Sequence, residues 1–296
     1  MSYVDKIDNQ CPIRFTSKQK REFQAFVRRE IKELPVCVIR TGDNENIVIG
    51  DVKSARVIIG AHYDTPMASV FPNMIFPTNL FARIAYNMLT MLIIVIMSLF
   101  IGFGVGNIFS LEYYIVVPIT FLLLSVVLYQ LYPNTHNLND NTSGIATIFN
   151  IIKTNNNLEH VAFILFDNEE KGKKGSASIS KAFGALNTKL VINLDCVGNG
   201  DRFLFIAKKD YCLEEYQKLK SFNNPTFTFI THQKGRVSSD YLSFSYGVSC
   251  VAVNSKGPLL YVPNIHTGAD NYVDDKNIEQ LTEFINIFLK EISNGN

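Results

Sequence analysis

The residues best suited to chemistry are two adjacent glutamates, Glu169 and Glu170, which follow an apolar run from Val161 to Phe166. A continuous apolar run of this kind is typical of a strand buried on both faces, as in a parallel sheet. In open α/β sheets, ligands bind just beyond the carboxyl ends of the strands. Because neighbouring side chains point in different directions, one glutamate could bind a metal while the other transfers a proton. The alternative is a solvent-exposed acidic turn, which is the commoner role of a Glu-Glu pair taken alone.

A second strand end carries a histidine and an aspartate. The mostly apolar run Ala55–Ala61 leads directly into His62 and Asp64. Because side chains alternate along a strand, the two side chains of a His-x-Asp pair lie on one face. The imidazole could then bind a metal while the carboxylate fixes its tautomer. An ordinary hydrogen-bonded His–Asp pair is the alternative.

Three further candidate ligands lie at strand ends or in loops. Asp140 lies in a polar loop just before a predicted helix, where a helix cap or an Asx-turn is the alternative role. Asp195 ends the predicted strand Leu190–Leu194, and His266 lies in a predicted loop over residues 264–270. Each of the three therefore has an ordinary structural role open to it when it is considered alone.

Together, the candidates form a set whose donor types suit one kind of metal. They are two imidazoles and three carboxylates: His62, Asp140, Glu170, Asp195 and His266. Nitrogen and oxygen donors of this kind favour zinc. Two zinc ions that share one carboxylate would use all five residues and leave Glu169 beside them.

The order and spacing of these motifs resembles the di-zinc aminopeptidase family, the zinc exopeptidases of bacterial aminopeptidase type. The similar stretches are residues 60–65, 140–144, 166–175, 193–195, 239–241 and 266–270. The resemblance covers most of the chain except a long apolar insertion and the first helix. It implies an α/β fold, a three-layer sandwich in which a mixed, mostly parallel β-sheet lies between helices.

The resemblance also implies a role for each candidate ligand. His62 and Asp195 would bind one zinc ion. Glu170 and His266 would bind the other, and Asp140 would bridge the two ions. The cofactor would thus be a pair of zinc ions, and the substrate would be a peptide that loses its N-terminal residues.

Two carboxylates would act beside the metals. Glu169 would be the general base that takes a proton from the attacking water, and Asp64 would orient His62. The resemblance further implies a strained backbone between Asp140 and Asn141, of which a cis peptide bond is one form.

Three other functions fit the same pattern. A glutaminyl cyclase-like acyltransferase shares this fold but uses one zinc ion, so a zinc count per chain would separate the two. A non-enzymatic membrane receptor on the same fold would be expected to lose ligands or the base, and none is lost. A carboxypeptidase acting on an acidic substrate also remains open, because a fold does not fix its substrate.

An insertion with almost no charged residues separates the first ligand motif from the second, because residues 84–111 and 113–139 contain no Asp, Glu, Lys or Arg. Its apolar stretches, Met88–Val105 and Tyr113–Tyr132, are each near the ~20 residues that a membrane-spanning helix needs. The glycines from Gly102 to Gly106 mark the expected join. We therefore expect a transmembrane helical hairpin over residues 80–132, with a buried helical pair in a soluble core as the alternative.

The hairpin divides the chain and predicts its location. Residues 1–79 and 133–296 would form one discontinuous zinc peptidase domain. Because the hairpin leaves soon after His62 and returns just before Asp140, both attachment points should lie near the rim of the metal cleft. The loop between the two spans has no Lys or Arg, so the positive-inside rule places the catalytic domain in the cytoplasm.

The composition agrees with a membrane-anchored enzyme that contacts lipid through the hairpin. The 296 residues carry a net charge of +1, which gives no electrostatic reason to expect a nucleic-acid partner. The five cysteines form no C-x-x-C pair, which favours a reducing compartment. The N-terminus also lacks the apolar core of a secretory signal.

Overall fold

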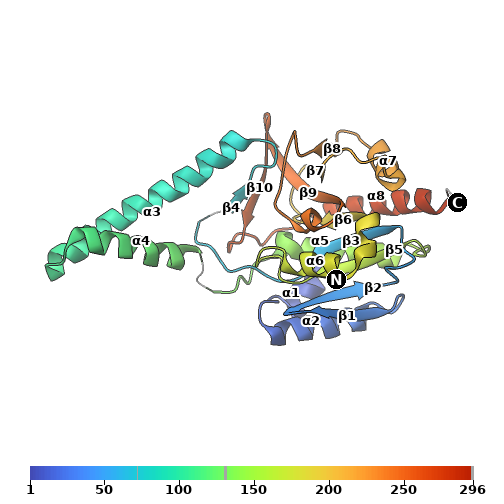
Figure 1. Ribbon diagram of the computed structural model, residues 1–296, viewed down its shortest axis with the longest axis horizontal. Helices are drawn as coiled ribbons and strands as arrows, with labels where there is room; N and C mark the ends of the chain where they lie inside the picture. The colour runs from blue at the N-terminus through green and yellow to red at the C-terminus, as the bar shows by residue number, and fades with distance from the viewer. Residues whose placement is uncertain (72, 130–131, 295–296) are drawn as a thin grey trace.

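The computed structural model describes residues 1–71, 73–129 and 132–294. Its centre is a ten-stranded mixed β-sheet flanked by helices (Figure 1). The strands are β1 (Val36–Thr41), β2 (Asn44–Ile49), β3 (Val57–His62), β4 (Asn73–Ile75), β5 (Val161–Phe166), β6 (Leu190–Leu194), β7 (Arg202–Ala207), β8 (Phe227–Thr231), β9 (Tyr246–Lys256) and β10 (Leu259–Ile265).

The strands that carry the candidate site run parallel in the middle of the sheet. The main order is β1-β2-β5-β3-β6-β9-β10-β4, and β7 pairs with both β9 and β8. β3 is parallel to β5 and to β6, and β6 is parallel to β9. The antiparallel pairs are β1–β2, β2–β5, β9–β10, β10–β4 and β7–β9. The predicted α/β fold with a mixed sheet between helices is therefore confirmed. Among the described residues, however, four strand pairs are parallel and five are antiparallel, so the sheet is mainly parallel only around β3 and β6.

Helices cover both faces of this sheet. They are α1 (Tyr3–Gln10), α2 (Ser17–Glu30), α3 (Leu80–Phe109), α4 (Tyr113–Tyr129), α5 (Ser143–Thr154), α6 (Lys174–Ala182), α7 (Glu214–Ser221) and α8 (Asp275–Asn294). A short π-helical turn lies at Leu138–Thr142, and short 3₁₀ helices lie at Gly184–Thr188 and Asp240–Ser243.

Alternation along β5 explains why both faces are covered. Phe163 and Leu165 join the core beneath α1, α2, α5, α7 and α8. Ala162 and Ile164 join a second core with α6 on the opposite face. Because successive side chains point to opposite faces, an uninterrupted apolar run requires a layer of helices on each side.

Some elements differ from what local patterns predict by a turn or by a whole strand. The apolar spacing of Phe23, Phe26 and Ile31 predicts an amphipathic helix over Ser17–Leu34, but α2 ends at Glu30. Ser176 is a residue type that often begins a helix, but α6 begins two residues earlier, at Lys174. The strand β10 was not predicted, because Pro263 and Asn264 near its end are residues that strands usually exclude. The predicted loop that carries His266 therefore begins within the last residues of this strand.

Helices α3 and α4 pack against each other and project as an arm from one end of the body (Figure 1). α3 has 30 residues and is long and apolar enough to cross a membrane, whereas α4 has 17 residues. Residues 130–131 of the predicted second span lie outside the described residues. Large apolar side chains on the arm are exposed, Phe100 at 78% and Ile108 at 76%, which is unusual for a protein surface in water.

The join between the two helices lies later in the chain than the glycines suggested. α3 continues through Gly102 and Gly106, and the connection is residues 110–112. A Cβ atom on Gly102 would lie 2.8 Å from the side chain of Val117, and one on Gly106 would lie 2.7 Å from the ring of Tyr113. The glycines therefore allow close packing of α3 on α4, a common use of small residues between apolar helices.

Candidate metal centre

The carboxylate of Asp140 lies between two imidazoles. Its Oδ1 is 3.0 Å from Nε2 of His62, and its Oδ2 is 3.0 Å from Nε2 of His266. His62 ends a strand that precedes the hairpin, and His266 follows β10 near the end of the chain. Residues that are about 200 positions apart in the sequence thus meet at one carboxylate.

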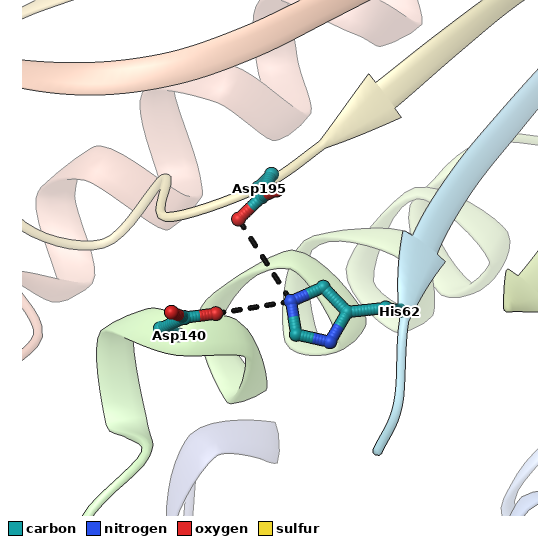
Figure 2. A group of neighbouring side chains, drawn as sticks. All are labelled: His62, Asp140 and Asp195. Atoms are coloured by element: carbon teal, nitrogen blue, oxygen red, sulfur yellow. Dashed lines mark hydrogen bonds and ion pairs between the residues drawn. The ribbon is translucent and has the colours of Figure 1, made fainter. Parts of the chain in front are cut away.

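Each imidazole has a second carboxylate beside it. Oδ1 of Asp195 lies 3.8 Å from Nε2 of His62, as Figure 2 shows together with Asp140. On the other side, Oε2 of Glu170 lies 3.3 Å from Nε2 of His266. The structure therefore brings all five predicted ligands together in two groups that share Asp140. One group adds His62 and Asp195, and the other adds Glu170 and His266. Within each group, the possible ligand atoms lie within 4.8 Å of one another.

The sheet topology explains most of this convergence. β3 pairs in parallel with β5 and with β6, and His62 lies directly opposite Phe166 in the register. The carboxyl ends of the three strands therefore meet at one edge. Glu170 follows β5 there, and Asp195 follows β6.

The segment that carries Asp140 is shaped by a second buried aspartate. The peptide bond between Asp140 and Asn141 is cis, as the resemblance implied. The carboxylate of Asp270 accepts hydrogen bonds from the main-chain amides of Asn139 at 2.8 Å and Asp140 at 3.0 Å. Because Asp270 lies four residues after His266, these bonds join the segments of two candidate ligands.

Asp64 contacts both predicted glutamates through their main chain. Its Oδ1 accepts from the amide of Glu169 at 2.9 Å and its Oδ2 from the amide of Glu170 at 3.2 Å. Towards His62, the nearest acceptor in Asp64 is the main-chain oxygen, 3.1 Å from Nδ1, while the carboxylate is 3.7 Å away. The carboxylate of Asp64 therefore positions the Glu169–Glu170 turn, a contact that the sequence did not predict.

Glu169 lies beside the two groups of candidate ligands. An oxygen of its carboxylate is within 4.8 Å of both His62 and Glu170. Its side chain is thus close enough to exchange a proton with a water molecule held between these residues.

The electrostatics of the site favour a bound cation. Burial raises the pKa of Glu169, Glu170 and Asp195, although the neighbouring imidazoles oppose the shift. Burial would also raise the pKa of Asp140, but hydrogen bonds from His266 and His62 hold it well below its usual range. Burial likewise acts to lower the pKa of both histidines, and the surrounding carboxylates more than offset that effect. A metal ion would reverse the cost of gathering so many carboxylates in one buried site.

One atom of the site also lacks a partner. Oε1 of Glu170 is buried and has no hydrogen-bond partner among the described residues. Unpaired buried carboxylate oxygens are costly, and a bound cation would satisfy this one. The donor types and this orphaned oxygen both fit zinc.

Comparisons with known proteins agree with the fold and the motifs. The family model described as peptidase family M28 matches residues 131–289. That range contains Asp140, the two glutamates, Asp195 and His266, whereas His62 and Asp64 precede it. No curated protein matches the chain.

Solved structures of bacterial enzymes superpose on almost the whole chain. The LapA aminopeptidase of Legionella pneumophila matches with a TM-score of 0.52 and 14% identity, over 97% of this chain and 68% of that chain. LapB of the same organism matches with a TM-score of 0.58 and 15% identity, over 98% and 70%. The glutaminyl cyclase of Porphyromonas gingivalis matches with a TM-score of 0.58 and 14% identity, over 98% and 96%. At these identities, the likeness establishes a shared fold.

Proposed function

The chain belongs to peptidase family M28, and from this premise we propose that it is a membrane-anchored, zinc-dependent aminopeptidase. The observation that carries the proposal is the position of Asp140, 3.0 Å from both His62 and His266. A further carboxylate lies beside each imidazole. This arrangement supports a pair of metal ions bridged by one carboxylate.

The proposed metal ligands are the five residues that converge on the site. His62 and Asp195 would hold one zinc ion, and Glu170 and His266 would hold the other. Asp140 would bridge them. When bound, zinc ions lower the pKa of water and polarise a carbonyl oxygen, which are the two requirements of peptide hydrolysis at neutral pH.

Glu169 would move the proton in this reaction. Its carboxylate would take a proton from the attacking water and pass it to the amine that leaves when the peptide bond breaks. The hydrogen bonds from the Glu169 and Glu170 amides to Asp64 support this role, because they hold the turn that presents both side chains. The free ammonium of the substrate would lie near the surrounding carboxylates, which favours removal of N-terminal residues.

Two spans in a membrane would anchor the enzyme. The length and apolarity of α3 and the exposed apolar side chains of the arm support this part of the proposal. α4 would be the second span, residues 80–132 would form the hairpin, and residues 1–79 and 133–296 the peptidase domain. The absence of Lys and Arg between residues 106 and 112 supports a cytoplasmic peptidase domain.

A comparison of free and blocked peptides tests the activity. The full-length protein in lipid vesicles should release the first residue from free-amino peptides and leave N-acetylated versions intact. A chelator should abolish the release, and zinc should restore it. Release of C-terminal residues from the blocked peptides would instead identify a carboxypeptidase.

The same assay separates the acyltransferase alternative. The structural match to a glutaminyl cyclase supports an acyltransferase as the second candidate function. A peptide that begins with glutamine would lose ammonia without any cleavage if the chain were such a cyclase. One zinc ion per chain would point the same way, and two would support the aminopeptidase.

A further inference from the structure

A cavity of about 340 Å³ opens beside the candidate metal centre. Its lining includes two candidate ligands, Glu170 and His266. It also includes Asp64, whose carboxylate accepts hydrogen bonds from the amides of Glu169 and Glu170. A cavity of this size holds one or two amino-acid side chains. A substrate bound at the metal centre would therefore extend into this space.

The hairpin contributes to the lining of this cavity. Tyr129, the last residue of α4, lines it together with Phe15 and Met67. Phe15 belongs to the N-terminal segment of the body, and Met67 lies shortly after His62 in the chain. Three aromatic or thioether side chains from separate parts of the fold thus line the space next to the candidate metal ligands.

Main-chain hydrogen bonds hold the body end of the hairpin next to His266. The carbonyl oxygen of Leu128 accepts from the amide of Val70 at 2.8 Å and from the hydroxyl of Ser69 at 3.3 Å. The amide of Ser69 donates to the carbonyl oxygen of His266 at 2.7 Å. One residue thus connects the end of α4 to a candidate ligand, so the position of Tyr129 is set relative to the metal centre.

The lining combines apolar and charged groups, because Lys20 and Lys171 line the cavity together with Phe15, Met67 and Tyr129. The ring of Tyr129 lies 6.2 Å from the ring of Phe71. The ammonium of Lys171, which also lines the cavity, lies 5.6 Å from the centre of the Phe15 ring. Aromatic and thioether surfaces contribute mostly apolar contact.

We propose that Tyr129 packs against a bulky apolar side chain of the peptide substrate, so that the hairpin is both anchor and part of the substrate site. Tyrosine at the end of an apolar helix suits the boundary between lipid and water. The cavity therefore begins where α4 leaves the bilayer, and the substrates are peptides held at the membrane surface. This inference rests on the proposed aminopeptidase function.

Replacement of Tyr129 tests the contact. For Tyr129→Ala in vesicles, we expect KM to rise about tenfold for peptides with leucine or phenylalanine next to the cleaved bond, since the loss of even one methylene contact in an apolar pocket is worth about 10- to 200-fold in discrimination. KM for the matching alanine peptides should change less than about twofold. Tyr129→Phe should resemble the wild type, because it keeps the ring.

The matched control is Tyr114→Ala. Tyr114 lies at the other end of the same helix and is 75% exposed, so this variant should keep wild-type kinetics. All variants should retain the wild-type metal content and kcat. An equal rise in KM for leucine and alanine peptides, or no rise at all, would refute the contact. If the wild type cleaves no peptide, the proposed function fails first, and this inference fails with it.

A linker series tests the membrane surface. Leucine peptides are attached to a lipid anchor by Gly/Ser linkers of increasing length and placed in the same vesicles as the enzyme. Because the cavity starts at the interface, we expect cleavage with linkers of only about five residues, which span at most ~18 Å. Cleavage that requires linkers beyond about 15 residues would place the site away from the bilayer and overturn the proposal.

Discussion

The guanidinium of Arg14 donates from Nε to the main-chain oxygen of Tyr63, 2.6 Å away. Tyr63 lies between His62 and Asp64. From the same guanidinium, Nη2 donates to Asn137 at 2.8 Å and to Thr142 at 3.1 Å, and these two residues flank Asp140. One fully buried cation therefore connects the segments of two candidate ligands, one before and one after the hairpin.

Loss of this cation should weaken both the fold and the metal site. Arg14→Met leaves several buried oxygens without a donor, so we expect the free energy of unfolding to fall by about 3 kcal/mol or more. Metal affinity should also fall, because His62 and Asp140 lose a common support. Denaturation and metal titration would measure both effects. Arg28→Met, on the exposed side of α2, is the control and should change neither.

The two adjacent glutamates should respond differently to the same substitution. Glu169→Gln cannot accept a proton, so kcat should fall about 100- to 10,000-fold while the metal content stays unchanged. Glu170→Gln should instead lower the metal content. Turnover kinetics combined with metal analysis would separate the two. Near-native turnover by metal-loaded Glu169→Gln would disprove the assignment of the base.

Asp240 should make the stability of the chelated protein depend on pH. It is fully buried, and burial raises its pKa to about 7 from an ordinary value of 3.8. The folded state therefore holds this proton more tightly than the unfolded state, and its contribution to stability is lost as the pH rises from about 4 through 7. We expect Asp240→Asn to gain up to about 4 kcal/mol relative to the wild type between pH 4 and pH 8. Melting temperatures that fall in parallel for the two proteins would contradict this.

Removal of the hairpin should separate anchoring from metal binding. A Gly/Ser linker in place of residues 81–131 should give a soluble protein that still binds metal, because the central sheet and all five proposed ligands remain. It should also lose the preference for leucine over alanine peptides, because Tyr129 is removed. Metal analysis and the ratio of kcat/KM values would test both expectations. An aggregated protein without metal would show that the hairpin is required by the fold.

The two ends of the hairpin should lie on the cytoplasmic side. Protease added to intact cells should leave the peptidase domain uncut, and the same protease should degrade it after permeabilisation. A soluble cytoplasmic marker, monitored in the same samples, controls for leakage. Degradation in intact cells would reverse the predicted orientation.

Local sequence patterns were enough to predict the strands that carry the site. The run Val161–Phe166 before Glu169 is continuously apolar, and the runs before His62 and Asp195 are mostly apolar. Such runs are stable only when both faces of a strand are buried. Polar residues at their ends then fall at one edge of a parallel sheet. For this reason, His62, Glu170 and Asp195 can be predicted as candidate ligands at one edge of the sheet. Asp140 and His266 lie outside these central strands, and their approach to that edge follows from the tertiary structure.

The supporting contacts depended on the tertiary structure. Asp64 reaches the amides of Glu169 and Glu170 only because β3 and β5 are adjacent and in one register. Arg14 reaches the site from a polar N-terminal segment, and Tyr129 reaches it from an apolar helix. The local pattern of neither segment predicts a contact with the site. The periodicity of apolar residues describes which face of a helix or strand is buried. Which distant side chains then meet depends on how these elements cross and pack, and no local sequence pattern contains that information.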